Sequence, residues 1–196
     1  MTPQEIAARL RPGGLAFAFD TNALFGNTSL FAVCSDVARH NDYLAAHSLP
    51  PVRLVISTVA HTEKLFDLKQ KFREKFDGAE ILRGLERKGL AIEPFEAEHA
   101  IETALRIGER NPTTAAWHEA KRQRCLECLG LPTATDTPGK GKGCGATVDW
   151  LIGGHARAPG CVLVTDDNGP EFDGLADRVK LDVLKAALQA ILNELA

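Results

Sequence analysis

The chain has 196 residues, of which 44% are hydrophobic, so we expect one compact domain with a full core rather than two domains. Its formal net charge of -3 and pI near 6.1 exclude a basic field over the whole molecule, so a nucleic-acid partner would have to be attracted by local patches. The first residues do not form a signal peptide, and no apolar run approaches the roughly 20 residues of a membrane span, which favours a cytoplasmic protein without a membrane partner.

The N-terminal half alternates predicted helices and strands. Thr2, Pro3 and Glu5 are typical of a helix start and predict a short helix to about Arg11. An apolar strand over residues 15–19 then ends at Asp20. The remaining elements predicted in this half are helices at about 29–47, 57–76 and 79–88, and strands at 52–56 and 90–92.

The C-terminal half continues this alternation around a segment of different composition. Residues 111–145 are rich in Thr, Gly, Pro, Lys and Cys, and we interpret them as an irregular insertion. The regular elements predicted here are helices at 96–108, 146–156 and 183–195, and strands at 161–164 and 179–181. The pattern predicts an α/β fold, with a parallel sheet flanked by helices on both faces and all strand ends on one side.

Four acidic residues recur at corresponding places in this pattern. Asp20 and Asp167 follow strands, whereas Glu63 and Asp149 lie in the opening turns of helices. If they meet at the strand ends, each like-charged pair at about 4 Å would cost roughly 4 kcal/mol at an effective dielectric near 20. Either protons or divalent cations must then neutralise them, and oxygen-only ligands favour Mg²⁺ or Mn²⁺. Such an ion can activate water and stabilise charge on a phosphoryl oxygen, as in metal-dependent nucleases and phosphatases.

Each of these acids also has a purely structural interpretation. Asp20, Asp166 and Asp167 could be capping or turn residues, Glu63 could pair with a lysine, and Asp149 could interact with the helix dipole. The joint pattern is harder to explain in that way than any single member.

With these residues in view, the chain resembles PIN-domain nucleases, including the VapC-type toxins of bacterial toxin–antitoxin pairs. The resemblance covers nearly everything outside the insertion. It rests on segments in family order: Phe19-Asp20-Thr21-Asn22, Ser57 with Glu63 six residues later, Ile92-Glu93-Pro94, Val148-Asp149 with the helix to Ala156, and Thr165-Asp166-Asp167.

The resemblance implies a single PIN-like domain over residues 1–196, with 111–145 as an insertion within it. It implies an endoribonuclease that uses Mg²⁺ or Mn²⁺ to hydrolyse RNA. The implied catalytic residues and metal ligands are Asp20, Glu63, Asp149 and Asp167, and the implied supporting residues are Asn22, Thr165 and Asp166. In the family the position of Asp167 varies most, and Asp166 could substitute for it. An antitoxin protein and a second copy of the chain are the protein partners that the family suggests.

The insertion contains a second candidate site. Cys125 and Cys128 have the spacing of a zinc knuckle, and Cys144 with His118 could complete a structural Zn²⁺ site. Packing of reduced thiols is the alternative, and a disulfide framework is not expected from five cysteines, an odd number. The segment is also locally basic, which suits either a solvated loop or a flap that contacts RNA.

Two other function classes are open at this point. One is a non-catalytic PIN-like module that binds RNA or protein. The other is a phosphatase of the haloacid dehalogenase type, which also has an aspartate at a strand end. That mechanism requires a second aspartate two residues later, where this chain has Asn22.

Overall fold

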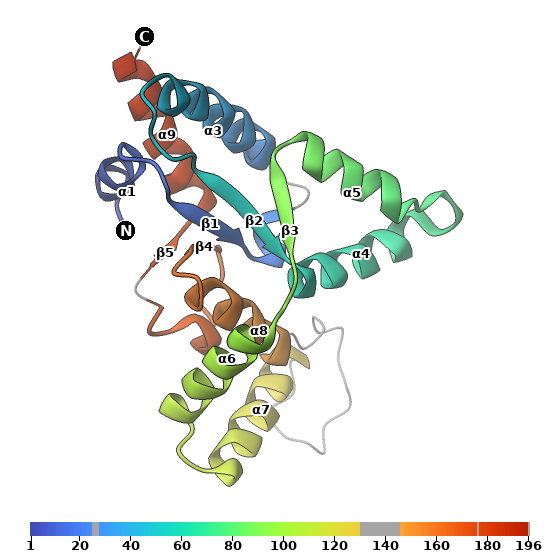
Figure 1. Cartoon of the computed structure of the whole chain (residues 1–196). Helices are drawn as coiled ribbons and strands as arrows, with labels where there is room; N and C mark the ends of the chain where they lie inside the picture. Colours follow the sequence, from blue (N-terminus) through green and yellow to red (C-terminus); the bar gives the residue numbers. More distant parts are fainter. Residues whose placement is uncertain (25–27, 130–145, 176, 196) are drawn as a thin grey trace.

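The computed structural model describes residues 1–24, 28–129, 146–175 and 177–195 (Figure 1). Within these ranges the chain forms a five-stranded, fully parallel sheet in the order β3-β2-β1-β4-β5. The strands are β1 (Ala16–Phe19), β2 (Arg53–Ser57), β3 (Leu90–Glu93), β4 (Val162–Val164) and β5 (Arg178–Val179). The predicted α/β class and parallel sheet are confirmed.

Helices cover both faces of this sheet (Figure 1). One face carries α1 (Pro3–Leu10), α3 (Thr28–Ala46) and α9 (Leu181–Leu195), and the other carries α6 (Ala97–Arg110) and α8 (Ala146–Arg157). The central strands are buried on both faces, which is why their sequences are continuously apolar rather than alternating. None of the helices in the described ranges is long and apolar enough to span a lipid bilayer.

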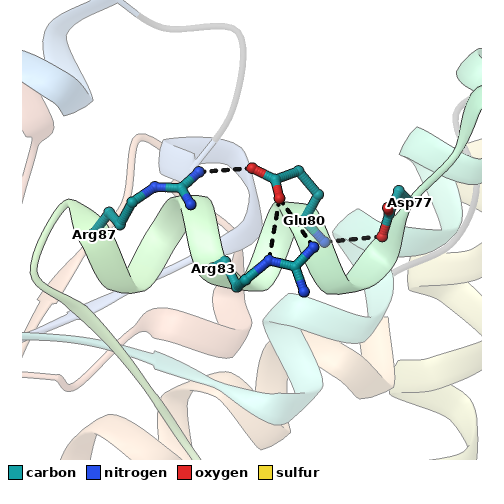
Figure 2. A network of polar contacts seen from close by, with 4 residues as sticks. All are labelled: Asp77, Glu80, Arg83 and Arg87. Atoms are coloured by element: carbon teal, nitrogen blue, oxygen red, sulfur yellow. Dashed lines mark hydrogen bonds and ion pairs between the residues drawn. The ribbon is translucent and has the colours of Figure 1, made fainter.

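The helix α4 (Thr58–Phe72), the short turn η1 (Arg73–Lys75) and α5 (Gly78–Arg87) extend beyond the β3 edge of the sheet (Figure 1). Figure 2 shows how local charges define α5. Asp77 caps the helix by accepting a hydrogen bond from the Glu80 amide, and the Glu80 carboxylate accepts hydrogen bonds from Arg83 and Arg87. These bonds, Arg87 first, lower the pKa of Glu80. The Glu80–Arg83 pair is three residues apart, a spacing at which opposite charges favour helix formation.

Several predicted boundaries differ from the structure. The helix predicted over 57–76 ends at Phe72, because Arg73 takes a φ of 51° that an α-helix cannot continue. The last strand is β5 at Arg178–Val179, and Leu181 already begins α9. Two short elements were not predicted: α2 (Thr21–Leu24) and the 3-10 turn η2 (Pro170–Phe172).

The prediction of an irregular insertion is wrong for its first half. Helix α7 (Thr114–Leu129) occupies that part, and Thr113 caps its start by accepting a hydrogen bond from the Ala116 amide. Its Trp117 packs edge-on against Trp150 of α8, with ring centroids 5.9 Å apart. Composition alone could not reveal a helix that depends on tertiary packing. Residues 130–145 lie outside the described residues.

Helices α6 and α8 pack closely because α8 contains Gly153 and Gly154. A Cβ atom on Gly154 would overlap Thr103 Oγ1 and lie 3.0 Å from the His99 carbonyl oxygen, both on α6. The Thr103 hydroxyl cannot easily turn away, since it donates a hydrogen bond of 2.7 Å to that same carbonyl. The glycine therefore sets the distance between the helix that carries Asp149 and its neighbour.

We expect Gly154→Ala to lower the free energy of unfolding by about 1–2 kcal/mol, because overpacking of about 1–3 kcal/mol exceeds the gain in helix propensity. Gly108→Ala on α6 is the matched control, since nothing lies within 4 Å of its added methyl group. That control should be stabilised by about 0.5–1 kcal/mol. Urea unfolding of both variants measures the difference, and equal shifts would contradict close packing at Gly154.

Candidate functional site

The predicted acids gather where the order of the strands reverses. From β1 the chain adds β2 and β3 on one side, and it then crosses back to add β4 and β5 on the other side of β1. Ligand sites in open parallel sheets lie outside the carboxyl ends of the strands at such a point. Asp20 follows β1, Thr165 follows β4, and Ser57 at the end of β2 caps the helix that carries Glu63.

Asp20 lies at the centre of the site and is 3% exposed. Its Oδ2 accepts a hydrogen bond of 2.6 Å from Thr165 Oγ1, and its Oδ1 accepts one of 2.6 Å from the Thr21 amide. Burial raises the pKa of Asp20 to about 6, against the effect of these two hydrogen bonds, and the charges of Asp167 and Glu63 raise it further. The carboxylate is thus held rigidly in place and repelled by its neighbours.

Glu63 is connected to Asp20 through Thr21. The Thr21 hydroxyl donates a hydrogen bond of 2.6 Å to Glu63 Oε2, while its amide binds Asp20. Phe66, three residues after Glu63 on α4, is 64% exposed, so Glu63 does not lie on a buried apolar stripe. Thr21, rather than burial among apolar side chains, directs Glu63 to the site. Sequence reasoning missed this role, although a threonine directly after the first acid was visible.

Asp149 lies in the first turn of α8 and is half-buried. Burial raises the pKa of Asp149 to about 8, and the negative charges of Asp20, Glu171, Asp167 and Glu63 add to the effect in that order. All of the other predicted acids therefore act on Asp149 electrostatically. We call Asp20, Glu63, Asp149 and Asp167 the acidic cluster.

The loop after β4 is organised around the Thr165 hydroxyl. Besides donating to Asp20, Thr165 Oγ1 accepts hydrogen bonds from the Asp167 amide at 3.0 Å and from Asn22 Nδ2 at 3.4 Å. Asn22 Oδ1 accepts a bond of 3.3 Å from the Asp166 amide. Asn22 and Thr165 thus connect the two strand ends. Asp167 raises the pKa of Asp20 and Asp149, whereas Asp166 is exposed and is not among the charges that do so, which favours Asp167 as the fourth acid.

Three residues that we did not predict complete the surroundings. Glu171 in η2 is 2% exposed, and Arg124 of α7 donates a hydrogen bond of 3.0 Å to its Oε1. Buried Arg106 of α6 donates to the Glu171 carbonyl oxygen at 2.5 Å. The signal that could have found Glu171 was weak: an acid four residues after Asp167, in a turn opened by Pro170.

The acidic cluster offers only oxygen atoms, and burial together with mutual repulsion raises the pKa of Asp20 and of Asp149. This donor chemistry fits a hard divalent cation such as Mg²⁺ or Mn²⁺. Across the described residues, no group of three or more Asp, Glu, His or Cys side chains lies close enough together to hold a metal ion. Side-chain rotation would be needed to bring the oxygens around an ion, so the metal ligands stay a prediction.

The structural zinc site also stays a prediction. Cys125 on α7 is half-buried, and His118 is exposed on the same helix. The Cys128 side chain and all of Cys144 lie outside the described residues. Cys34 and Cys161 are free and buried, as expected of reduced packed thiols, and burial raises the pKa of each to about 11.

Comparison with protein-family models gives no match, and neither does comparison with curated proteins. Among solved structures, the chain is similar to the "Crystal structure of DNA bound VapBC from Salmonella typhimurium". That match has 19% sequence identity and a TM-score of 0.44, and it covers 85% of this chain and 98% of that chain. At this degree of similarity, the function has to be inferred from the side chains and topology of the chain itself.

Proposed function

We propose that the protein is a metal-dependent endoribonuclease of the PIN type, which hydrolyses RNA phosphodiester bonds with Mg²⁺ or Mn²⁺. One observation carries this proposal: the acidic cluster lies where the strand order reverses, and its charges repel one another. Burial first, and then the charges of Asp20, Glu171, Asp167 and Glu63, raise the pKa of Asp149 to about 8. Such repulsion is relieved when a doubly charged ion binds.

In this proposal Asp20, Glu63, Asp149 and Asp167 would hold the ion. When bound, Mg²⁺ or Mn²⁺ activates a water molecule for attack on phosphorus and offsets the charge that develops on the phosphoryl oxygens. Thr165 and Thr21 keep Asp20 and Glu63 oriented through hydrogen bonds of 2.6 Å.

The biological role and the protein partners belong to the same proposal. If the resemblance to VapC-type toxins extends to function, the chain is the toxin of a toxin–antitoxin pair in the cytoplasm. Its partners are then RNA, an antitoxin protein and a second copy of the chain. This step rests on the sequence resemblance alone.

The direct test is to incubate the purified chain with single-stranded RNA, single-stranded DNA and an aryl phosphate, each with Mn²⁺, Mg²⁺ or EDTA. We expect RNA cleavage with either ion and none with EDTA, because water activation needs the cation. Hydrolysis of the aryl phosphate alone would favour the phosphatase. RNA binding without cleavage under any condition would favour the non-catalytic module.

A further inference from the structure

A cavity of about 240 Å³ lies next to the acidic cluster, between α7, α8 and the turn η2. Trp117, Trp150, Lys121, Arg110, Arg124 and Glu171 are the lining residues that matter here. Pockets for drug-sized ligands usually measure about 300–1,000 Å³, so this one suits a single flat ring system better than a larger molecule.

The aromatic wall of the cavity is built from the two tryptophans of the chain. They meet edge to face, at an interplanar angle of 88°. Trp150 is buried, and the Arg106 guanidinium lies 5.2 Å from its ring centroid. Trp117 is only half-buried and has Lys121 Nζ over its ring at 5.2 Å. Trp150 is thus fixed as a support, whereas Trp117 can be reached once the long Lys121 side chain moves.

The rim of the cavity is cationic although the neighbouring cluster is acidic. Lys121, Arg110 and Arg124 line it, against one carboxylate, Glu171, that is already paired with Arg124. Arg110 approaches Asp173 only loosely, at 3.9 Å on the surface. An aromatic surface beside cations matches a nucleotide, which has a flat base and an anionic phosphate.

The cavity lies directly beside the acidic cluster. Trp150 directly follows Asp149 in α8, and Glu171 both lines the cavity and raises the pKa of Asp149. A Cβ atom on Gly169 would lie 2.8 Å from Arg124 Nη2 and 3.4 Å from Asp167 Oδ1, so the cavity wall reaches the fourth acid. An RNA strand whose phosphate is at the cluster would therefore have a neighbouring nucleotide at the cavity.

We infer that this cavity binds the base of a nucleotide next to the scissile phosphate of single-stranded RNA, with Trp117 as the stacking surface and Lys121 and Arg110 as phosphate contacts. The inference rests on the proposed nuclease function. A base paired within a duplex cannot enter, because its faces are already covered by neighbouring bases. The enzyme then selects unpaired RNA.

Binding can be measured without cleavage, on the full-length chain in EDTA. Both tryptophans line the cavity, so their intrinsic fluorescence reports its occupancy. We expect a ten-nucleotide single-stranded RNA to quench this fluorescence saturably, and an abasic strand of equal length or a duplex to quench it much less. Quenching by the abasic strand or the duplex equal to that by the RNA would overturn the inference.

Affinity is then measured by the anisotropy of labelled RNA. Trp117→Ala should weaken binding by about tenfold or more, the usual loss on removing a stacking aromatic, whereas Trp117→Phe should stay within about threefold. Phe31→Ala is the matched control. Like Trp117, Phe31 is a solvent-accessible aromatic (49% exposed) with a lysine over its ring, Lys88 at 5.6 Å, but it lies on α3 over the other face of the sheet. Circular dichroism and thermal unfolding establish that each variant is folded.

The outcomes separate this inference from the proposed function. If folded Trp117→Ala binds RNA as well as wild type, the cavity is not a base site, even if Mn²⁺-dependent cleavage persists. If Trp117 is required for binding but no cleavage occurs with Mn²⁺, the cavity inference holds and the nuclease proposal fails. Equal weakening by Phe31→Ala would also overturn the inference, since it would indicate general loss of surface aromatics.

Discussion

Asp20→Asn should reduce RNA cleavage in Mn²⁺ by more than about 100-fold while the protein stays folded. Loss of a group that only orients a metal ligand costs about 10- to 100-fold, so loss of a ligand itself should cost more. The substitution keeps the size of the side chain and one oxygen, which can still accept the hydrogen bond from the Thr21 amide. It removes a buried charge that Asp167 and Glu63 repel. We therefore expect a change in stability within about 1 kcal/mol.

The comparison needs an aspartate that lies outside the site. Asp42, exposed on α3, fits this purpose, and Asp42→Asn should cleave RNA like wild type. Cleavage rates at saturating Mn²⁺ and urea unfolding of the three proteins are measured side by side. Undiminished cleavage by folded Asp20→Asn would exclude the acidic cluster as the catalytic centre.

The sheet was predictable because its central strands are apolar almost throughout. Apart from Arg53, residues 15–19, 52–56 and 161–164 are continuously apolar, as buried strands are, and alternation with helices favours parallel neighbours. Helix α7 was not predictable in this way. Its large apolar residues, Trp117, Leu126 and Leu129, are too few for a periodic pattern, and α7 gains its stability by packing against Trp150. The turn η2 likewise depends on a distant residue, because Arg106 of α6 donates a hydrogen bond to the Glu171 carbonyl oxygen.

The four acids of the cluster could be predicted because each follows a strand or opens a helix, and parallel topology brings those places together. The hydrogen bonds between them could not. Thr21 donates a hydrogen bond to Glu63, 42 positions away in the sequence, and Thr165 donates one to Asp20, 145 positions away. Glu171 was missed because a buried glutamate is recognisable only by its partner, and Arg124 comes from the segment that we took for an irregular insertion.

The largest effect on stability should be a pH dependence that originates at Asp149. Its pKa is about 8 in the folded protein against an ordinary value of 3.8 for an aspartate, so the folded state binds the proton more tightly. The resulting stabilisation is complete below about pH 4 and is lost as the pH rises through 8. Below pH 6.5 a second group opposes this trend, because burial lowers the pKa of His155 to about 4. Between pH 6.5 and 8.5 the effect of Asp149 is therefore the clearest.

We expect the metal-free protein to lose about 1–2 kcal/mol of unfolding free energy between pH 6.5 and 8.5, since one pKa unit corresponds to about 1.4 kcal/mol. Asp149→Asn cannot ionise and should be nearly flat over this range and more stable than wild type at pH 8.5. Mn²⁺ should restore the stability of wild type at high pH but not that of the variant, because the ion replaces the proton as the neutralising charge. Urea unfolding at four pH values, with EDTA or Mn²⁺, measures all three. A pH profile shared by both proteins would mean that Asp149 ionises normally, and the repulsion on which the metal proposal depends would be absent.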